Sequence, residues 1–505
     1  MGDTYLLGVD FGGGGSKATL LADDGHIIAI STKEYPTRHP REGWAEQDPG
    51  EVYGAFVANT REILNVSGID PHAIAAICLD AATHTAVLLD GKGNLVRDSI
   101  YWTDRRAVKQ AGYLNEQWAE RIMSLCLNAP NLLWTLPQLM WLKENEPEVH
   151  AKIRTVLFMK DYIRFRLTGE VATDSIDAMG CLLMDEGTGR WSEELCALAG
   201  LDVSMLPRIA DPRDIAGFVT GLSAAETGLA AGTPVLTGAT DTVMEVYASG
   251  AISPGQATVK LATAGRICAI TDFGIPHPML VNYRHIVPGL WYPGTATKSC
   301  AASYRWYRDV LCEGERTRAA SAGESAYEIM DREAASIPAG SDGLFFHPYL
   351  QGEMTPYLDN NLRGSFIGLS SFHGKAHFTR AVLEGVAYSL FDCIGVLREL
   401  GVEPRQAIVI GGGAASPLWR GILADISGIE LSKNENDDSS SLGSAMLAGV
   451  AAGVFDSFRD SVEKCVHVRE TIKPDPGRHA FYLEKFKTYK AIHDALAPVY
   501  GDMAR

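Results

Sequence analysis

The residues best suited to chemistry near the start of the chain are an acid, a run of glycines and a lysine. Asp10 ends an apolar segment that begins at residue 5, four glycines occupy residues 12–15, and Lys17 follows. Backbone amides in a glycine-rich turn can approach a phosphate closely. A carboxylate at a strand end can hold Mg²⁺, usually through water, and the lysine can face the phosphates. This segment therefore indicates a phosphate site, with a plain glycine-rich hairpin as the alternative.

Two familiar phosphate motifs do not fit this segment. A Walker A loop has glycine directly before its lysine, and this chain has Ser16 there. A dinucleotide-binding fingerprint continues into a helix, whereas a β-pattern follows Lys17. A nicotinamide-dependent oxidoreductase is therefore disfavoured.

Two further turns of small residues follow apolar segments later in the chain. Residues 261–265 contain Thr263 between two alanines, and the triplet 411–413 is all glycine, with Ser416 shortly after it. A turn of the second kind lets a flat adenine or ribose lie against the backbone. Each turn alone is read more simply as structural, but three such turns together favour a nucleotide site.

The elements that must position these turns repeat along the chain. Apolar segments at 5–10 and 18–21 flank the first turn, and segments at 257–261 and 267–271 flank the second. Two strand–turn–strand units indicate a duplicated lobe, with a boundary near residues 230–250. Helices are predicted at 48–66, 377–400, 418–427 and 440–454, and a last one at 478–498.

Composition limits the class of partner. The 505 residues include 45 Lys and Arg against 62 Asp and Glu, a formal charge of −17. This balance disfavours non-specific binding to DNA, RNA or anionic lipid. Nine cysteines without a CxxC pair, no signal-like start and no apolar run of about 18 residues predict a cytoplasmic protein outside the membrane.

Several segments carry a resemblance to a known family. Residues 364–369, a seven-residue gap and then 377–384 match one family signature at every defined position. Similar stretches lie at 44–49, 102–105, 160–162, 167–169, 348–353 and 411–419. The chain therefore resembles the FGGY family of carbohydrate kinases over nearly its whole length, and within that family it is most similar to xylulokinases.

This resemblance implies an α/β fold of two ribonuclease-H-like (actin-like ATPase) lobes that flank a catalytic cleft. Residues 1–240 would form the N-terminal, sugar-binding lobe, and 241–470 the C-terminal, ATP-binding lobe. Residues 471–505 would form a helix that packs on the N-terminal lobe. The expected ligands are a small-molecule sugar, ATP and Mg²⁺, and the resemblance also suggests a homodimer.

Roles for single residues follow from the same resemblance. Asp241 aligns with the catalytic base, although its sequence context alone predicts only an Asx turn after Gly238. Asp10 joins it as the second catalytic acid, and both are expected to hold Mg²⁺. The implied sugar-binding residues are Thr83, His84, Trp102, Asp241 and Thr242. The implied nucleotide-binding residues are Gly12, Gly13, Gly14, Lys17, Thr263, Ala302, Gly411, Gly412, Gly413 and Ser416.

Departures from the family pattern affect the substrate more than the reaction. Thr242 stands where xylulokinases have Asn, which removes an amide that would hold a sugar hydroxyl. Further departures occur at Gly13, Gly14, Ala262, Gln138 and Met354. The predicted reaction is phosphorylation of the terminal primary hydroxyl of a ketopentose, D-xylulose first. The alternatives are another ketose or polyol (ribulose, erythritol, ribitol or glycerol) and a non-catalytic actin-like sensor of sugar or nucleotide.

Overall fold

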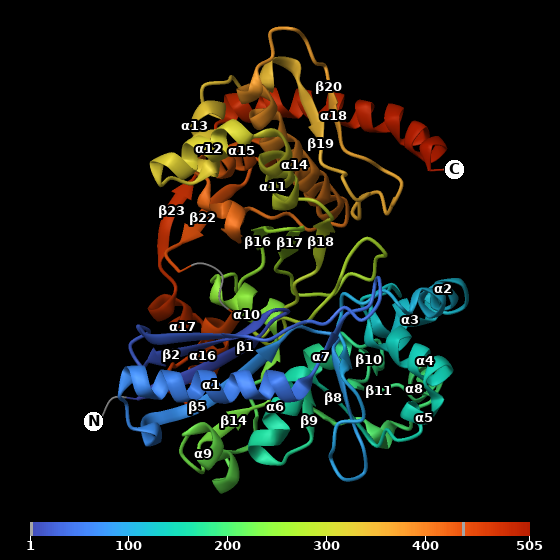
Figure 1. Ribbon diagram of the computed structural model, residues 1–505, viewed down its shortest axis with the longest axis vertical. Coiled ribbons are helices and arrows are strands. Elements are labelled where there is room, and N and C mark those ends of the chain that lie inside the picture. The colour runs from blue at the N-terminus through green and yellow to red at the C-terminus, as the bar shows by residue number, and fades with distance from the viewer. Residues whose placement is uncertain (1–3, 437–439, 505) are drawn as a thin grey trace.

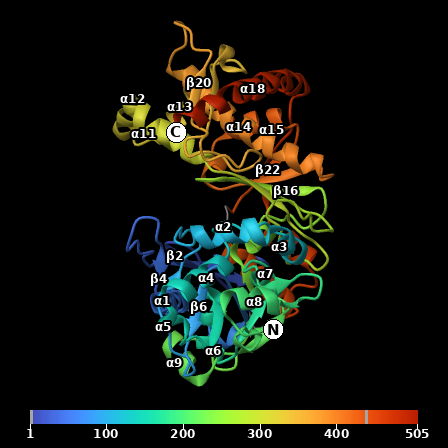
Figure 2. The same cartoon turned by 90° about the vertical axis from the view of Figure 1, so that its right-hand side faces the viewer.

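A computed structural model describes residues 4–436 and 440–504 as two lobes stacked along the long axis of the molecule (Figures 1 and 2). Each lobe is built on one large mixed β-sheet. The first sheet runs in the order β13-β14-β5-β1-β2-β3, with β15 also paired to β5. Its strands are β1 (Tyr5–Phe11), β2 (Gly15–Ala22), β3 (Ile27–Glu34), β5 (Ile74–Ala81), β13 (Ile215–Phe218), β14 (Pro234–Leu236) and β15 (Ala239–Thr240).

The second sheet repeats this arrangement in the order β23-β22-β21-β16-β17-β18. Its strands are β16 (Gln256–Leu261), β17 (Gly265–Ala269), β18 (Gly294–Thr297), β21 (Gln406–Ile410), β22 (Glu430–Asn434) and β23 (Val468–Ile472). In both sheets three antiparallel strands are followed by two parallel neighbours and a final antiparallel edge strand. The predicted duplication is therefore confirmed at the level of strand order and direction.

Helices cover both faces of each sheet. The N-terminal lobe carries α1 (Pro49–Ser67), α2 (Val108–Gln117), α3 (Ala119–Cys126), α4 (Thr135–Asn145), α5 (Pro147–His150), α6 (Met159–Thr168), α7 (Ser175–Met179), α8 (Glu193–Ala199), α9 (Gly221–Thr227) and α10 (Asp241–Ala248). Later helices are α11 (Ala301–Leu311), α12 (Glu313–Ala322), α13 (Ala326–Ala334), α14 (Lys375–Glu399), α15 (Pro417–Ser427), α16 (Ser440–Ala451), α17 (Phe458–Cys465) and α18 (Pro476–Met503). None of the helices within the described ranges is long and apolar enough to cross a membrane.

Short two-stranded ribbons complete the lobes outside the main sheets. They pair β4 (Glu46–Gln47) with β7 (Ser99–Ile100), β6 (Ala86–Leu89) with β8 (Thr155–Phe158), β9 (Ala172–Asp174) with β12 (Arg208–Ala210), β10 (Met184–Asp185) with β11 (Arg190–Trp191), and β19 (Phe345–His347) with β20 (Ser365–Ile367). The local sequence explains where many elements begin. Helix α1, for example, starts where the Asp48 carboxylate accepts the Gly50 amide at 2.8 Å and Pro49 occupies the first turn.

The first lobe includes two helices, α10 and α16, from the part of the chain that the sequence assigned to the second lobe. Helix α10 contributes Val243 and Tyr247 to the core that packs on one face of the first sheet. Helix α16 lies in the chain between β22 and β23 of the second sheet, yet it joins the same core, with Ser441 hydrogen-bonded to Thr19 of β2 at 2.8 Å. Packing thus assigns residues 241–248 and 440–465 to the N-terminal lobe, although the sequence placed them in the second.

The last helix lies on the other lobe from the one predicted. The buried side chains Tyr482 and Tyr489 of α18 belong to the core of the C-terminal lobe. Tyr482 donates a hydrogen bond to Glu384 of α14 at 2.7 Å. The expected packing on the N-terminal lobe is wrong because α18 directly follows β23, an edge strand of the second sheet, and a short connection keeps consecutive elements together.

Glycine at position 443 allows α16 to cross α10 at close range. A Cβ at Gly443 would lie 2.2 Å from the carbonyl oxygen of Met244. We therefore expect Gly443→Ala to lower the free energy of unfolding by about 1–3 kcal/mol through overpacking. Gly395→Ala in α14 is the control, since no atom lies within 4 Å of its Cβ position; it should stabilise the helix by about 0.5–1 kcal/mol. Chemical denaturation of both variants checks this, and equal effects would contradict the close crossing.

Candidate active site

Three carboxyl groups meet at one edge of the first sheet. Asp10 lies near the end of β1, Asp80 near the end of β5, and Asp241 begins α10 directly after β15. The three strands are parallel neighbours, with Asp10 in register with Asp80, and Asp80 in register with Ala239. Because the carboxyl ends of parallel strands share one edge, the fold itself brings these acids together.

Burial changes how these carboxyl groups ionise. It raises the pKa of Asp10 to about 6, and the nearby Asp241 carboxylate adds to the rise while Asp80 and Lys17 oppose it. Burial and the negative charge of Asp10 raise the pKa of Asp80 well above its usual range. Burial also raises the pKa of Asp241, against the opposing charge of Lys260. The cluster is therefore a site where a cation stabilises the ionised state.

The donor set at this edge fits Mg²⁺. The Oδ1 atoms of Asp10 and Asp80 are buried without a hydrogen-bond partner in the part of the chain that the structure describes. Carboxylate oxygens are the hard ligands that Mg²⁺ prefers, and the ion usually keeps water and substrate phosphate in its shell. Among the described residues, no group of three or more Asp, Glu, His or Cys has the geometry of a complete metal cage. Asp10 would therefore supply only part of the coordination.

The catalytic candidate Asp241 is oriented by its neighbour. Thr242 donates to Asp241 Oδ1 from its backbone amide at 2.6 Å and from its hydroxyl at 3.1 Å. The same hydroxyl accepts a hydrogen bond from Nη1 of Arg266 at 3.2 Å. The carboxylate is thus fixed from one side by a chain of hydrogen bonds that begins on the second lobe.

Basic residues from both sheets face the acids. Lys17 on β2 is in register with Asp10, and Arg266 on β17 is in register with Lys260 on β16. The Lys260 ammonium pairs with Glu245 of α10 at 2.6 Å. Lys260 and Arg266 both oppose the rise in the pKa of Asp241. The second lobe therefore supplies positive charge to the acidic edge of the first.

His84 is held within the protein through both ring nitrogens. Its backbone has a φ of 69°, its Nδ1 lies 2.5 Å from the Gly180 carbonyl oxygen, and its Nε2 lies 2.9 Å from the Tyr283 hydroxyl. Burial lowers the pKa of His84 to about 4, so the ring is neutral at pH 7. Nδ1 then donates to Gly180 and Nε2 accepts from Tyr283. Neither nitrogen is free for a sugar hydroxyl in this conformation.

A buried ionic cluster positions the Gly180 carbonyl. The Lys160 ammonium lies 2.7–2.8 Å from carboxylate oxygens of Asp161, Asp174 and Asp177, and its side chain is fully buried. Asp174 also caps α7, since its carboxylate accepts the Ile176 amide at 2.7 Å. The cluster therefore fixes the helix that ends at the partner of His84.

The other predicted sugar contacts lie beside this histidine. The Thr83 hydroxyl interacts with the Tyr283 hydroxyl. Trp102 packs against a small buried cluster formed by Ala45, Ala82 and Tyr101. The pKa of Tyr101 is raised by burial first and then by the charge of Asp241, which places this cluster near the acidic edge. Thr83, His84, Trp102, Asp241 and Thr242 therefore lie in one region.

Hydrogen bonds to its backbone carbonyl groups hold the first glycine turn in place. Gly12 O accepts from the Tyr35 hydroxyl at 2.7 Å, and Gly13 O accepts from Thr37 at 2.5 Å and from Gln47 at 3.2 Å. At Gly13 a Cβ would lie 2.7 Å from the Tyr101 hydroxyl oxygen, whereas Gly14 faces open space. Because β2 rather than a helix follows the turn, the dinucleotide-binding alternative is excluded.

The two turns of the second lobe lie side by side. They follow the parallel neighbours β16 and β21, and a Cβ at Gly411 would lie 3.0 Å from the Leu261 carbonyl oxygen. The amide of Ala302, at the start of α11, reaches the Thr263 carbonyl at 3.3 Å. Ser416 caps α15 by accepting the Trp419 amide at 3.0 Å. The predicted nucleotide residues Thr263, Ala302, Gly411, Gly412, Gly413 and Ser416 thus share one end of the second sheet.

Sequence reasoning missed four residues of the site, namely Asp80, Lys260, Arg266 and Tyr283. Asp80 follows the apolar segment 74–79, the same context that singled out Asp10. Lys260 and Arg266 flank the second turn as Asp10 and Lys17 flank the first. The duplicated hairpin therefore contained the signal for Lys260 and Arg266, and the apolar segment before Asp80 contained the signal for that residue. Tyr283 lies in an irregular segment between β17 and β18, and no local pattern identifies it.

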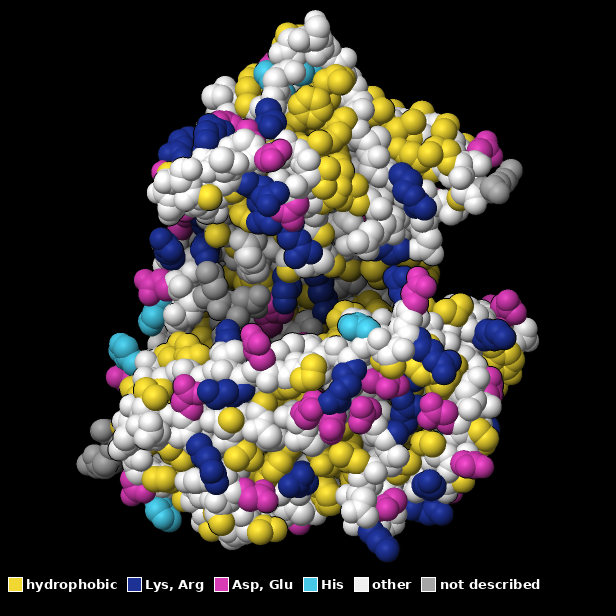
Figure 3. All heavy atoms as spheres, in the orientation of Figure 1, with side chains coloured by type: hydrophobic (Ala, Val, Ile, Leu, Met, Phe, Trp, Pro, Cys, Tyr) yellow, Lys and Arg dark blue, Asp and Glu magenta, His cyan; other side chains and the backbone are white. Residues whose placement is uncertain are grey.

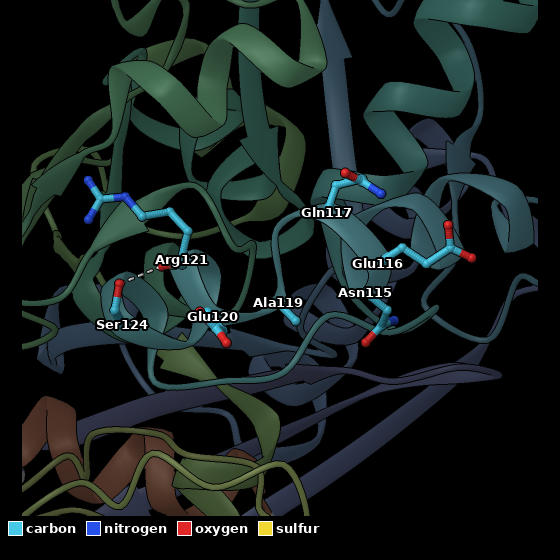
Figure 4. A pocket seen from close by; sticks show the side chains of 7 residues that line it. All are labelled: Asn115, Glu116, Gln117, Ala119, Glu120, Arg121 and Ser124. Atoms are coloured by element: carbon cyan, nitrogen blue, oxygen red, sulfur yellow. Dashed lines mark hydrogen bonds between the residues drawn. The ribbon is translucent and has the colours of Figure 1, made fainter.

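The surface is concave between the two lobes (Figure 3) and also beside α2 and α3. The molecule is hollowed between the lobes, where acidic and basic side chains are visible (Figure 3). A second hollow lies between α2 and α3 and is lined by Asn115, Glu116, Gln117, Ala119, Glu120, Arg121 and Ser124 (Figure 4). It contains none of the predicted site residues. The chemistry described above therefore belongs to the region between the lobes.

Comparisons with known proteins agree with this architecture. Residues 5–247 match the N-terminal domain, and residues 273–452 the C-terminal domain, of the FGGY family of carbohydrate kinases. The chain is 30% identical over 495 residues to a xylulose kinase of Bacillus subtilis, covering 97% of this chain and 96% of that protein. It is 29% identical over 510 residues to a gluconokinase of the same organism, covering 99% and 96%. The crystal structure of a xylulose kinase from Rhodospirillum rubrum superposes with a TM-score of 0.91 at 30% identity, covering 98% and 100%.

The raised pKa of Asp10 predicts a pH-dependent affinity for divalent cations. A cation binds the ionised carboxylate, and protons compete below the folded-state pKa of about 6. We expect Mg²⁺ affinity to be level above about pH 7 and to fall by up to about tenfold per pH unit below pH 6. Calorimetric titration with Mg²⁺ from pH 5 to 8 measures this. The Asp10→Asn variant should bind Mg²⁺ weakly, and its affinity should change less with pH. A wild-type affinity for Mg²⁺ at pH 5 equal to that at pH 8 would contradict the assignment of Asp10 as an ion ligand.

Proposed function

Because the chain belongs to the FGGY family of carbohydrate kinases and is an ATP-dependent carbohydrate kinase, we propose that Asp241 is its catalytic base. In this proposal the γ-phosphoryl group of ATP passes to the terminal primary hydroxyl of a small sugar or sugar derivative. One observation carries the proposal. Asp241 is fixed by two hydrogen bonds from Thr242 at the edge where Asp10 and Asp80 also end, opposite the turns of the second lobe.

The environment of Asp241 suits a base. Burial raises its pKa towards the working range of a general base, while Lys260 and Arg266 limit the rise. In its ionised form, which both of these cations favour, the carboxylate can accept the proton of the sugar hydroxyl as its oxygen attacks phosphorus. Phosphoryl transfer depends mainly on positioning and on neutralising charge.

The remaining residues hold the nucleotide and the ion in this proposal. The turns 12–14, 262–264 and 411–413 offer backbone amides to the phosphates and the nucleoside, and Lys17 faces the phosphates. Asp10, with Asp241 nearby, would hold Mg²⁺, which when bound with ATP draws charge from the phosphate oxygens. Closure of the two lobes over both substrates would exclude the water that otherwise hydrolyses ATP.

The names of the relatives suggest two substrates. D-Xylulose, a neutral ketopentose, is the first candidate because it names the relatives from Bacillus subtilis and Rhodospirillum rubrum. D-Gluconate is the second, from the gluconokinase that is 29% identical over almost the whole chain. Both carry a terminal primary hydroxyl. The neutral polyols and other ketoses predicted from the sequence stay in the test panel.

Replacing the base tests the proposal. We expect Asp241→Asn to reduce sugar-dependent ADP release by about 100- to 10,000-fold, because the amide cannot accept the proton. Nucleotide binding, followed by calorimetry with a non-hydrolysable ATP analogue, should stay within about threefold. The matched control is Asp309→Asn, an exposed acid of α11 that pairs with Arg308. Near-normal turnover in Asp241→Asn would refute the assignment of the base.

A further inference from the structure

Arg266 differs from the buried arginines elsewhere in the protein. Arg106, Arg164, Arg380 and Arg420 each pair with a carboxylate, at 2.8, 3.0, 2.7 and 2.8 Å respectively. Arg266 is also largely removed from solvent, yet its guanidinium has no carboxylate within 4 Å among the residues at 4–436 and 440–504. Its hydrogen bond runs to a neutral group, the hydroxyl of Thr242.

The groups around this guanidinium are those of the predicted sugar site. Thr242 links Arg266 to Asp241 through hydrogen bonds of 3.2 and 3.1 Å. Tyr283 and Tyr292, stacked with ring centroids 5.6 Å apart, also lie near it, and Tyr283 binds the neutral ring of His84. The positive charge of Arg266 acts to lower the pKa of His84, of Asp241 and of both tyrosines. Of these four residues only Asp241 has a carboxyl group, and in the proposed function that group serves as the catalytic base.

A partly buried guanidinium without a counter-charge is costly, and a planar carboxylate can supply that charge. Removing a cation from water is unfavourable unless it is paired and hydrogen-bonded. The guanidinium fork matches a carboxylate with two parallel hydrogen bonds. Hydroxyl groups of a neutral ketose accept hydrogen bonds but bring no charge. A ligand that carries a carboxylate therefore suits this position better than a neutral sugar.

We propose that Arg266 binds a carboxylate of the substrate, so that the protein phosphorylates an aldonate, a straight polyhydroxy acid, rather than a neutral ketose. This inference rests on the proposed function, because it places the acceptor hydroxyl at Asp241. The hydrogen-bonded chain from Asp241 through Thr242 to Arg266 puts base and guanidinium on one side of the same space. One polyhydroxy acid can then present its terminal hydroxyl to Asp241 and its carboxylate to Arg266.

Arg266 could alternatively serve Asp241 alone, as a distant positive charge that keeps the base ionised. The two roles predict different results for a substitution. A counter-charge for the base affects kcat for every substrate equally and shifts the acidic limb of the pH profile. Loss of a carboxylate-binding residue lowers kcat/KM for acidic substrates, mainly through KM, by a much larger factor than it lowers kcat/KM for neutral ones.

The experiment compares acidic and neutral substrates on the full-length protein. ADP release is measured with MgATP and D-gluconate, D-arabinonate and D-erythronate, then with D-xylulose, D-ribulose, erythritol and glycerol. Wild-type kcat/KM should be at least about tenfold higher for one of the aldonates than for any neutral compound. Arg266→Met should lower kcat/KM for that aldonate by about 100-fold, mainly through KM, and Arg266→Lys should lose less.

Controls separate the failure of this inference from that of the kinase assignment. Arg332→Gln changes an exposed arginine of α13 that pairs with Glu324, and should leave all rates unchanged. Calorimetric titration with the aldonates tests their binding without turnover, and Arg266→Met should abolish it. Thermal unfolding checks that each variant is folded.

The results with acidic and neutral substrates distinguish failure of the carboxylate-binding role of Arg266 from failure of the proposed kinase reaction. Turnover of D-xylulose or another neutral compound with inactive, non-binding aldonates would overturn the inference and leave the proposed kinase intact. An equal loss on acidic and neutral substrates in Arg266→Met would assign the residue to Asp241 and also overturn it. Aldonate binding that depends on Arg266, without ADP release, would support carboxylate binding by Arg266 but would overturn the phosphorylation of aldonates. No binding and no turnover of any compound would refute both.

Discussion

The mutual repulsion of Asp10, Asp80 and Asp241 is the constraint on which the rest of the site depends. Parallel pairing of their strands leaves no other place for these carboxyl groups than one buried sheet edge. Burial raises the pKa of all three carboxyl groups, and the charge of Asp241 adds to the rise at Asp10 and Asp80, so positive charge nearby favours their ionised forms. Lys17 supplies some of it from the same sheet, and Lys260 and Arg266 supply more from the other lobe. In the proposed function a divalent cation bound with ATP would add further positive charge at this edge.

Duplication of the lobe explains how opposite charges come to face each other. The two sheets share strand order and direction, so the two hairpins hold equivalent positions. The first hairpin carries Asp10 and Lys17 in register, whereas the second carries Lys260 and Arg266. One copy of the scaffold thus bears the acids that we propose as ion ligand and base, and the other bears the cations that face them. At Gly443, α16, which lies in the chain between β22 and β23 of the second sheet, crosses α10 and packs into the first lobe.

Much of the local structure was predictable because it depends on short-range patterns. The helix predicted at 48–66 is observed at Pro49–Ser67 with Asp48 as its cap, and the one predicted at 377–400 at Lys375–Glu399. The three small-residue turns do follow strands. The position of the final helix was wrong, since its packing depends on how β23 pairs within the second sheet. The roles of the site residues stay predictions until the variants are measured.

By itself the sequence determined the family, the two hairpins and the candidate base, because these depend on residue types at fixed local spacing. Only the tertiary structure decided which groups surround Asp241. Asp80 is in register with Asp10 although 70 residues separate them, and Arg266 reaches Thr242 across the gap between the lobes. It also revealed that both nitrogens of His84 are engaged, one by Gly180 and one by Tyr283. Such contacts join segments far apart in the chain, and no local pattern encodes them, because pairing and packing of whole elements set their distances.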